Sequence, residues 1–230
     1  MNETLPLSLV PSLPAQAIDE LLTLGETLQG IARGFQVDIV DGRFVETTSW
    51  PFTETDPIAA LASLAPLSAH FDLAVDCMVI EPERFFLPLL EVGVDRVLIH
   101  LGSTDMEAAI ANARLCELTV AMAFTNDADL ETVRALIPLI DYVQVMGIAE
   151  VGKQGQPFDE RTLDTVSTLR AEFPDLTIAV DGSVNEDTIV PLLKAGANRF
   201  APGSAIAKAD DPVEAFATLA TLIGLQQPKA

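Results

Sequence analysis

The chain has 230 residues, of which 49% are hydrophobic and 20% charged, a composition typical of a globular protein and not of a disordered or collagen-like one. Its two cysteines, Cys77 and Cys116, are too few for a disulfide scaffold or a cysteine zinc knuckle. The net charge of −21, from 34 acidic and 13 scattered basic residues, argues against binding to nucleic acid or to anionic membranes.

Short apolar or β-branched runs alternate along the chain with longer stretches rich in Ala, Leu and Glu. The strand-like runs are 5–10, 35–40, 70–75, 95–100, 117–123, 141–147, 176–181 and 198–202. The helix-like stretches are 14–33, 56–65, 82–92, 104–115, 127–138, 159–172, 185–195 and 211–223. Helix start signals are Asp105, Asn126-Asp127 and Asn185, and glycine stop signals are Gly34, Gly93 and Gly196.

Eight strand–helix units of even length predict a parallel sheet closed into a (β/α)8 TIM barrel that forms a single domain over residues 1–230. The alternative is an open doubly wound sheet, but no Gly-x-Gly-x-x-Gly motif follows the first strand, so a dinucleotide site is not supported. No targeting segment and no apolar run of membrane-spanning length is visible. We therefore expect a cytoplasmic protein that binds neither membranes nor nucleic acid.

Active residues of such barrels lie at the carboxyl ends of the strands. There the chain places Gln36, Asp38, Asp76, His100 and Asp181. Because side chains alternate along a strand, Gln36 and Asp38 share one face. The buried carboxylates of Asp38, Asp76 and Asp181 would repel one another inside the barrel without a cation. The aspartates could also cap helices or close turns, the interpretation that we favour for Asp41 beside Gly42.

The loops after the last two strands are candidate phosphate sites, because backbone N–H groups in these loops often bind phosphate in barrels. Gly182-Ser183 and Gly203-Ser204 lie there, although ordinary turns would explain such pairs too. Ser8, His100 and Met146 complete the predicted substrate-binding set, although a hydrogen-bonded core histidine is the alternative for His100. The glycine-rich loop 147–158 is either a mobile lid or an ordinary solvent loop.

These motifs together resemble the ribulose-phosphate 3-epimerase family over nearly the whole chain. Residues 36–45, Gln-Val-Asp-Ile-Val-Asp-Gly-Arg-Phe-Val, are similar to the family's His-Val-Asp-Val-Met-Asp-Gly-x-Phe-Val. Residues 76–79, 145–158, 180–185 and 203–206 are similar to its other motifs.

The resemblance implies epimerisation of a phosphorylated ketopentose through an enediolate, with Asp38 and Asp181 as the acid/base pair, in a protein that we expect to be a homo-oligomer. The family's metal is held by two histidines and these two aspartates, but the histidine positions hold Gln36 and Asp76. The set Gln36, Asp38, Asp76 and Asp181 would suit Mg²⁺ or Mn²⁺ better than zinc. Alternatively no metal binds, and the chain is a non-catalytic or altered-activity barrel that binds sugar phosphates. A Schiff-base aldolase is disfavoured, because all four lysines lie in predicted loops or helices.

Overall fold

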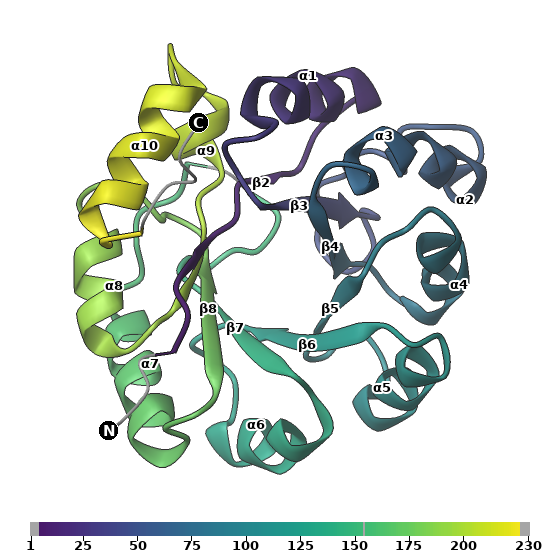
Figure 1. Cartoon of the computed structure of the whole chain (residues 1–230). Helices are drawn as coiled ribbons and strands as arrows, with labels where there is room; N and C mark the ends of the chain where they lie inside the picture. The colour runs from purple at the N-terminus through teal and green to yellow at the C-terminus, as the bar shows by residue number, and fades with distance from the viewer. Residues whose placement is uncertain (1–4, 154, 226–230) are drawn as a thin grey trace.

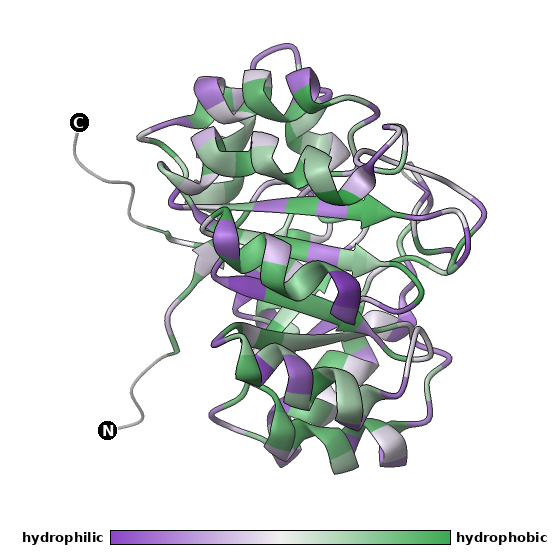
Figure 2. Cartoon of the chain, turned by 90° about the vertical axis from the view of Figure 1, so that its right-hand side faces the viewer, coloured by the Kyte–Doolittle hydropathy of each residue, from purple (hydrophilic) through white to green (hydrophobic). Residues whose placement is uncertain are grey.

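The computed structural model describes residues 5–153 and 155–225 and shows a parallel sheet curled into a barrel, with helices around it (Figure 1). Its strands are β1 (Ser8–Leu9), β2 (Ser12–Leu13), β3 (Gly34–Val40), β4 (Asp72–Met78), β5 (Arg96–His100), β6 (Thr119–Phe124), β7 (Tyr142–Met146), β8 (Thr177–Asp181) and β9 (Arg199–Ala201). They pair in the order β1-β9-β8-β7-β6-β5-β4-β3-β2, all in parallel. Figure 2 shows strands running in the same direction between layers of helices.

The short strands β1 and β2 close the barrel because they are two parts of one interrupted strand. β1 pairs with β9 and β2 pairs with β3, so this segment joins the two ends of the sheet. The N–H of Val10 donates to the carbonyl of Phe200 at 2.8 Å, and the carbonyl of Pro11 accepts from the N–H of Gln36 at 2.8 Å. Proline has no N–H to donate, which accounts for the break in the ladder. The prediction of a (β/α)8 barrel is confirmed.

The helices lie on the outside, where the predicted alternation places them. They are α1 (Ile18–Leu28), α2 (Pro57–Ala60), α3 (Ala65–Ser68), α4 (Glu83–Glu91), α5 (Met106–Leu115), α6 (Leu130–Leu136), α7 (Arg161–Glu172), α8 (Ile189–Ala195), α9 (Ser204–Ala207) and α10 (Pro212–Leu222). Two 3₁₀ turns, Leu61–Leu64 and Ile137–Leu139, extend α2 and α6. In the part of the chain that the structure describes, no helix has the length and apolar character needed to cross a bilayer.

Several predicted helix ends were wrong. The first helix ends at Leu28, and Gly34 begins β3 instead of following a helix. The cap of α6 is Asp129, whose carboxylate accepts two backbone N–H groups, and not the earlier Asn126-Asp127 pair. Asn185 closes a turn before α8, whose cap position is Thr188. The cap at Asp105 and the left-handed stop residues Gly93 and Gly196 were predicted correctly.

Alternation along the strands divides the buried side chains into an outer and an inner core. Outward residues such as Val37, Ile39 and Val180 pack against the helices in the main hydrophobic cluster. Inside the barrel, the middle level is an apolar layer that separates the two ends of the lumen; its residues are Ala74, Leu98, Ala121, Tyr142 and Ala179. Polar side chains therefore lie at the strand ends, above and below this layer.

Candidate active site

Three aspartates meet at the carboxyl ends of β3, β4 and β8. Asp38 and Asp76 are paired in register on adjacent strands, and Asp181 is the last residue of β8. All three are buried, and one carboxylate oxygen from each lies within 4.8 Å of the others. Because side chains alternate between the two faces of a strand, all three aspartates point into the lumen. The expected acidic cluster is therefore present.

Gln36 joins two of these carboxylates. Its side-chain Nε2 donates to Asp38 Oδ1 at 3.0 Å and to Asp181 Oδ2 at 2.7 Å. Gln36 is fully buried, and its Oε1 has no hydrogen-bond partner among the described residues. The amide therefore holds Asp38 and Asp181 together while leaving one buried acceptor free.

The third carboxylate, Asp76, accepts hydrogen bonds from two other buried side chains. His100 Nε2 lies 2.7 Å from Asp76 Oδ1, and Gln144 Nε2 donates to Asp76 Oδ2 at 2.9 Å. His100 thus lies against Asp76 and is absent from the lining of the cavity described below. Sequence reasoning overlooked Gln144, although a lone amide within the apolar strand β7, on the same face as Met146, was a usable signal.

Burial and mutual repulsion shift the proton affinities of the acidic cluster. Burial, reinforced by the charges of Asp181 and Asp76, raises the pKa of Asp38 well above its ordinary value. Burial and the charge of Asp76 raise the pKa of Asp181 to about 7, even though the hydrogen bond from Gln36 lowers it. In the absence of a cation, a carboxylic acid and a carboxylate can therefore coexist here near neutral pH.

A cavity of about 280 Å³ opens above Asp38 and Asp181. Its remaining lining comes from the strand ends and the loops that follow them: Ser12, Pro14, Met78, Met146, Ile148, Gly152, Lys153, Gly155, Gln156, Gly182, Ser183, Val184, Asn185, Gly203, Ser204 and Ala205. Among the described residues, Lys153 is the one cation of this lining, and its ammonium pairs with Glu150 on the same loop. The cavity thus combines two carboxylates with a wall of backbone and hydroxyl groups.

The part of the lining that follows β8 and β9 has features that suit an anion. Gly182 and Ser183 have positive φ values of 96° and 53°, which turn the chain sharply after β8. Ser204 begins α9, and the first N–H groups of a helix have no partner within the helix. The structure thus brings Met146, Gly182, Ser183, Gly203 and Ser204 to one cavity, as expected.

Ser8 does not join this group. It lies in β1 and lines a separate cavity at the N-terminal ends of the strands, whereas Ser12 lines the cavity beside the aspartates. The segment 8–13 crosses the barrel from one end to the other. Ser8 therefore lies at the N-terminal ends of the strands, whereas Ser12, four residues later, lies near the aspartates. The sequence expectation for Ser8 thus fails, and Ser12 takes its place.

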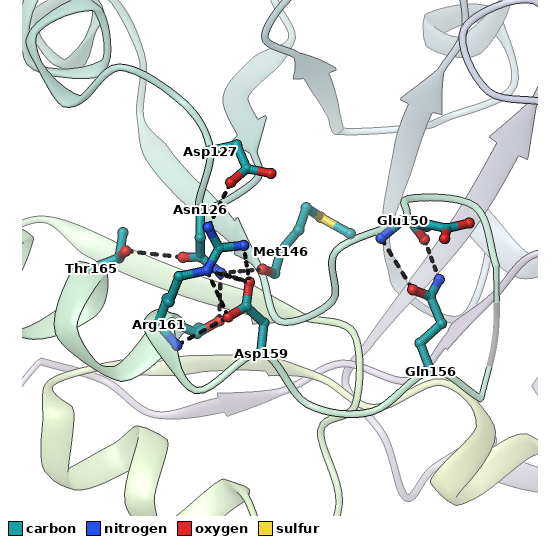
Figure 3. A network of polar contacts seen from close by, with 9 residues as sticks. Asn126, Asp127, Met146, Glu150, Gln156, Asp159, Arg161 and Thr165 are labelled. Atoms are coloured by element: carbon teal, nitrogen blue, oxygen red, sulfur yellow. Dashed lines mark hydrogen bonds and ion pairs between the residues drawn. The ribbon is translucent and has the colours of Figure 1, made fainter.

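The loop between β7 and α7 forms one side of the cavity and is anchored at both ends (Figure 3). Asn126 donates to the carbonyl of Met146 at 3.3 Å and to Asp159 at 3.1 Å, and Arg161 binds Asp159 (Figure 3). Nearer the cavity, the side chain of Gln156 exchanges hydrogen bonds with the backbone of Glu150. These contacts fix where the loop leaves and rejoins the barrel.

Close backbone contact between the ends of β7 and β8 sets the shape of the cavity floor. The N–H of Gly147 donates to the carbonyl of Asp181 at 2.6 Å. A Cβ atom on Gly147 would overlap the carbonyl oxygen of Gly182. Glycine is therefore required here by space, because backbone atoms cannot move aside as a flexible side chain can.

We expect Gly147→Ala to lower the free energy of unfolding by about 1–3 kcal/mol and to weaken sugar-phosphate binding, because the turn after β8 must shift. Chemical denaturation and calorimetric titration measure the two effects. Gly30→Ala is the control, since Gly30 has a φ of 76° but open space around it and lies outside the site. Substrate affinity should fall only in Gly147→Ala, and equal affinities in the two variants would contradict the prediction.

The acidic cluster also offers a donor set for a divalent cation. The oxygens of Asp38, Asp76 and Asp181 lie close enough to share one ion, and the free Oε1 of Gln36 is a fourth candidate ligand. Carboxylate and amide oxygens are hard ligands that suit Mg²⁺ or Mn²⁺. The residues present fit such an ion if the Gln36 amide turns its oxygen toward the carboxylates.

Comparison with known proteins identifies relatives over most of the chain. The model of the Ribulose-phosphate 3 epimerase family matches residues 6–207. A ribulose-phosphate 3-epimerase of Mycobacterium tuberculosis is 31% identical over 220 residues, which cover 92% of this chain and 90% of that protein. The enzyme of the same name from Schizosaccharomyces pombe is 30% identical and covers 85% of this chain and 84% of its own length.

Solved structures of more distant proteins share the fold. A 3-hexulose-6-phosphate synthase superposes with a TM-score of 0.70 at 20% identity, covering 94% of this chain and 99% of that one. A mutant tryptophan synthase alpha-subunit from Pyrococcus furiosus gives a TM-score of 0.71 at 16% identity, covering 94% and 98%. At these identities the likeness concerns the barrel alone.

Proposed function

This chain belongs to the ribulose-phosphate 3-epimerase family, and we propose that it inverts a phosphorylated ketopentose at C3, the carbon next to the carbonyl, through an enediolate. The observation that carries the proposal is the meeting of two buried carboxylates, Asp38 and Asp181, in one cavity. The apolar and backbone walls of that cavity would exclude water and hold the rest of the sugar.

Epimerisation removes a proton from one face of a carbon and returns a proton to the other face. It therefore needs a base and an acid at the same time, on opposite sides of the substrate. Asp38 and Asp181 come from different strands and have raised pKa values. In the proposed reaction one of them, as carboxylate, takes the C3 proton, while the other, as carboxylic acid, delivers its proton to the opposite face. The two then exchange roles for the reverse reaction.

The phosphate of the substrate would lie against the wall formed by Gly182, Ser183, Gly203 and Ser204. Neutral backbone N–H groups and hydroxyls can bind a dianion without a cluster of basic residues. This arrangement suits a chain whose net charge of −21 gives no long-range attraction for anions. Lys153 also lines this cavity, but its ammonium is paired with Glu150, so the positive charge that it brings to the site is largely compensated.

A divalent cation, when bound, would be held by Asp38, Asp76, Asp181 and the side-chain oxygen Oε1 of Gln36. Its charge would stabilise the enediolate oxygen. The protein also holds these carboxylates itself: the amide of Gln36 donates to Asp38 and Asp181, and His100 Nε2 lies against Asp76. Gln36 therefore orients both members of the proposed acid/base pair through its own hydrogen bonds.

A second function, binding of a sugar phosphate without turnover or with altered activity, is favoured by one observation. The oxygens of Asp76 already accept hydrogen bonds from His100 and Gln144, and the NH₂ group of Gln36 faces the other two carboxylates. Protein donors thus occupy positions where a cation would bind. If the enediolate needs a metal that these donors exclude, the barrel binds its ligand and stops there.

The deciding experiment is incubation of the protein with D-ribulose 5-phosphate in deuterated water, followed at C3 by NMR. Parallel samples contain a chelator, Mg²⁺, Mn²⁺ or Zn²⁺. We expect deuterium incorporation at C3 together with formation of the epimer in at least one condition. Binding of the sugar phosphate with no exchange under any condition would contradict the proposed epimerase and support the binding function.

Rebuilding the family's histidines tests the metal preference. We expect Gln36→His combined with Asp76→His to shift the preference of the site toward Zn²⁺, because imidazole nitrogen suits zinc better than amide oxygen does. The measurement is the melting temperature of both proteins with each cation, since an ion that binds only the folded state raises it.

In this comparison Mg²⁺ or Mn²⁺ should stabilise the unmodified protein most. If that protein ignores every divalent cation while the double variant responds to zinc, the expected native metal site is wrong.

A further inference from the structure

The end of the barrel opposite the active site has an unusual charge arrangement. Arg96 and Arg199 are the first residues of β5 and β9, and alternation places them on the inward face with Leu98 and Ala201. The apolar layer that contains Leu98 and Tyr142 separates them from the aspartates. The lumen therefore carries carboxylates at its carboxyl end and guanidinium groups at its N-terminal end. The strand arrows in Figure 2 point to the right, away from this N-terminal end.

Buried atoms without a hydrogen-bond partner divide by chemistry between the two ends. Among the described residues, such acceptors are Oε1 of Gln36 and Oε1 of Gln144, both beside the aspartates. At the other end, the unpartnered atoms are Nε of Arg96 and Nη2 of Arg199, and the unpartnered phenolic oxygen belongs to Tyr142 in the apolar layer between the two ends. A guanidinium group can only donate hydrogen bonds, and a phenol can donate one. What is missing at this end is an acceptor.

Arg199 is a buried cation with an unpartnered donor atom. It is only 7% exposed, and its guanidinium carbon lies 5.4 Å from the centre of the Tyr142 ring. Burial lowers its pKa, and the neighbouring charge of Arg96 lowers it further. A buried cation beside another cation is costly unless a counter-charge is bound.

The protein itself supplies little counter-charge here. Asp72, the first residue of β4, lines the same cavity as Arg199, and its negative charge acts on that arginine. Its side chain is 46% exposed and accepts a hydrogen bond from Nε of Arg33 at 3.0 Å. Asp141 is engaged by Arg114 and by the backbone of Val120. The positive charge of Arg96 and Arg199 is thus left mostly uncompensated within the described residues.

Arg96 and Arg199 line a cavity of about 430 Å³. Arg33, Arg96, Arg199, Asp72 and Ser8 form its polar part, and the rest is an apolar collar that includes Leu7, Ile31 and Phe216. Three arginines around one cavity are notable in a chain with 13 basic and 34 acidic residues. The hydroxyl-bearing residue Ser8 adds a further donor to the same wall.

We propose that this cavity binds a small phosphate-bearing anion, held by Arg96 and Arg199 with support from Arg33 and Ser8. The site lies on the opposite side of the apolar layer from the active-site cavity, and it does not depend on the proposed epimerase activity. Its guanidinium groups offer the forked donors that match phosphate oxygens.

The test separates the two ends of the barrel. Ser204→Glu places a negative charge in the active-site cavity and so disfavours anion binding there. Inorganic phosphate is then titrated into this variant by calorimetry. We expect one phosphate site to remain. Adding Arg96→Gln and Arg199→Gln to the same background should weaken phosphate binding by at least about tenfold, as loss of charge-assisted hydrogen bonds predicts.

Arg134→Gln in the Ser204→Glu background is the matched control, because Arg134 pairs with Glu131 and Glu172 on the outer surface. It should leave phosphate binding unchanged. A second readout needs no arginine variant: phosphate should shift the side-chain Nε–H NMR signals of Arg96 and Arg199 in Ser204→Glu. Absence of phosphate binding to Ser204→Glu, or equal binding after the two arginine substitutions, would overturn the proposal.

Discussion

Replacing Asp38 or Asp181 by asparagine is expected to lower epimerisation of ribulose 5-phosphate by about 10³-fold, within the range that general acid–base catalysis contributes. Each asparagine preserves the shape of the side chain but cannot accept or deliver the C3 proton. The steady-state rate in both directions measures the loss. Substrate affinity should change far less, because the phosphate wall lies on other residues.

A sharper expectation follows from the two-sided mechanism. In Asp38→Asn, Asp181 still faces one side of C3 and can exchange the proton of one epimer with solvent. In Asp181→Asn, the opposite epimer should exchange. Deuterium washout measured separately for the two epimers therefore distinguishes a pair of bases from a single base.

Asp105→Asn is the matched control for this charge removal. Asp105 caps α5 by accepting the N–H of Ala108 at 3.2 Å, and asparagine is an equally good cap residue. Its activity should equal that of the unmodified protein. If Asp38→Asn or Asp181→Asn keeps full epimerisation, the assigned acid/base pair is wrong.

Without a cation, the acidic cluster should make the protein less stable as the pH rises. Folding raises the pKa of Asp181 from 3.8 to about 7, so between these values the folded state binds more protons than the unfolded state. The associated stability is present below about pH 4 and is lost progressively up to about pH 7. At about 1.4 kcal/mol per pKa unit, the loss is on the order of a few kcal/mol.

Urea denaturation in chelator from pH 4.5 to 8 measures this loss. Asp181→Asn removes the shifted group, so the difference between the two proteins isolates its contribution from the general repulsion of a chain with net charge −21. We expect the variant to be the more stable protein at pH 8, and Mg²⁺ or Mn²⁺ to restore stability to the unmodified protein. A pH dependence identical in both proteins would refute the shifted pKa as the cause.

Much of the architecture could be predicted from local patterns. The regular alternation of apolar runs and helix-like stretches indicated the barrel, because parallel strands buried on both faces leave that signature. Asp38 and Asp181 were found because each interrupts or ends an apolar strand at the end where barrels place their chemistry. The glycine pairs after β8 and β9 were found by the same argument from position.

Features that depend on contacts distant in sequence could not be predicted in this way. The interrupted first strand becomes visible only when residues 8–13 pair with β9 on one side and β3 on the other. That pairing places Ser12, and not Ser8, beside the aspartates. The burial of Gln144, bonded to Asp76 across 68 positions of sequence, follows from the same closure.

The sequence by itself thus determined the fold class and the positions of Asp38 and Asp181 toward the carboxyl ends of their strands, since both are encoded in the order of polar and apolar residues along single strands. Only the tertiary structure decided which side chains form hydrogen bonds with the carboxylates of Asp76 and Asp181. It also decided that Arg96 and Arg199 share one cavity. The physical reason is that a strand's alternation fixes which face a side chain takes. Its neighbours on that face come from other strands, and barrel closure sets their register.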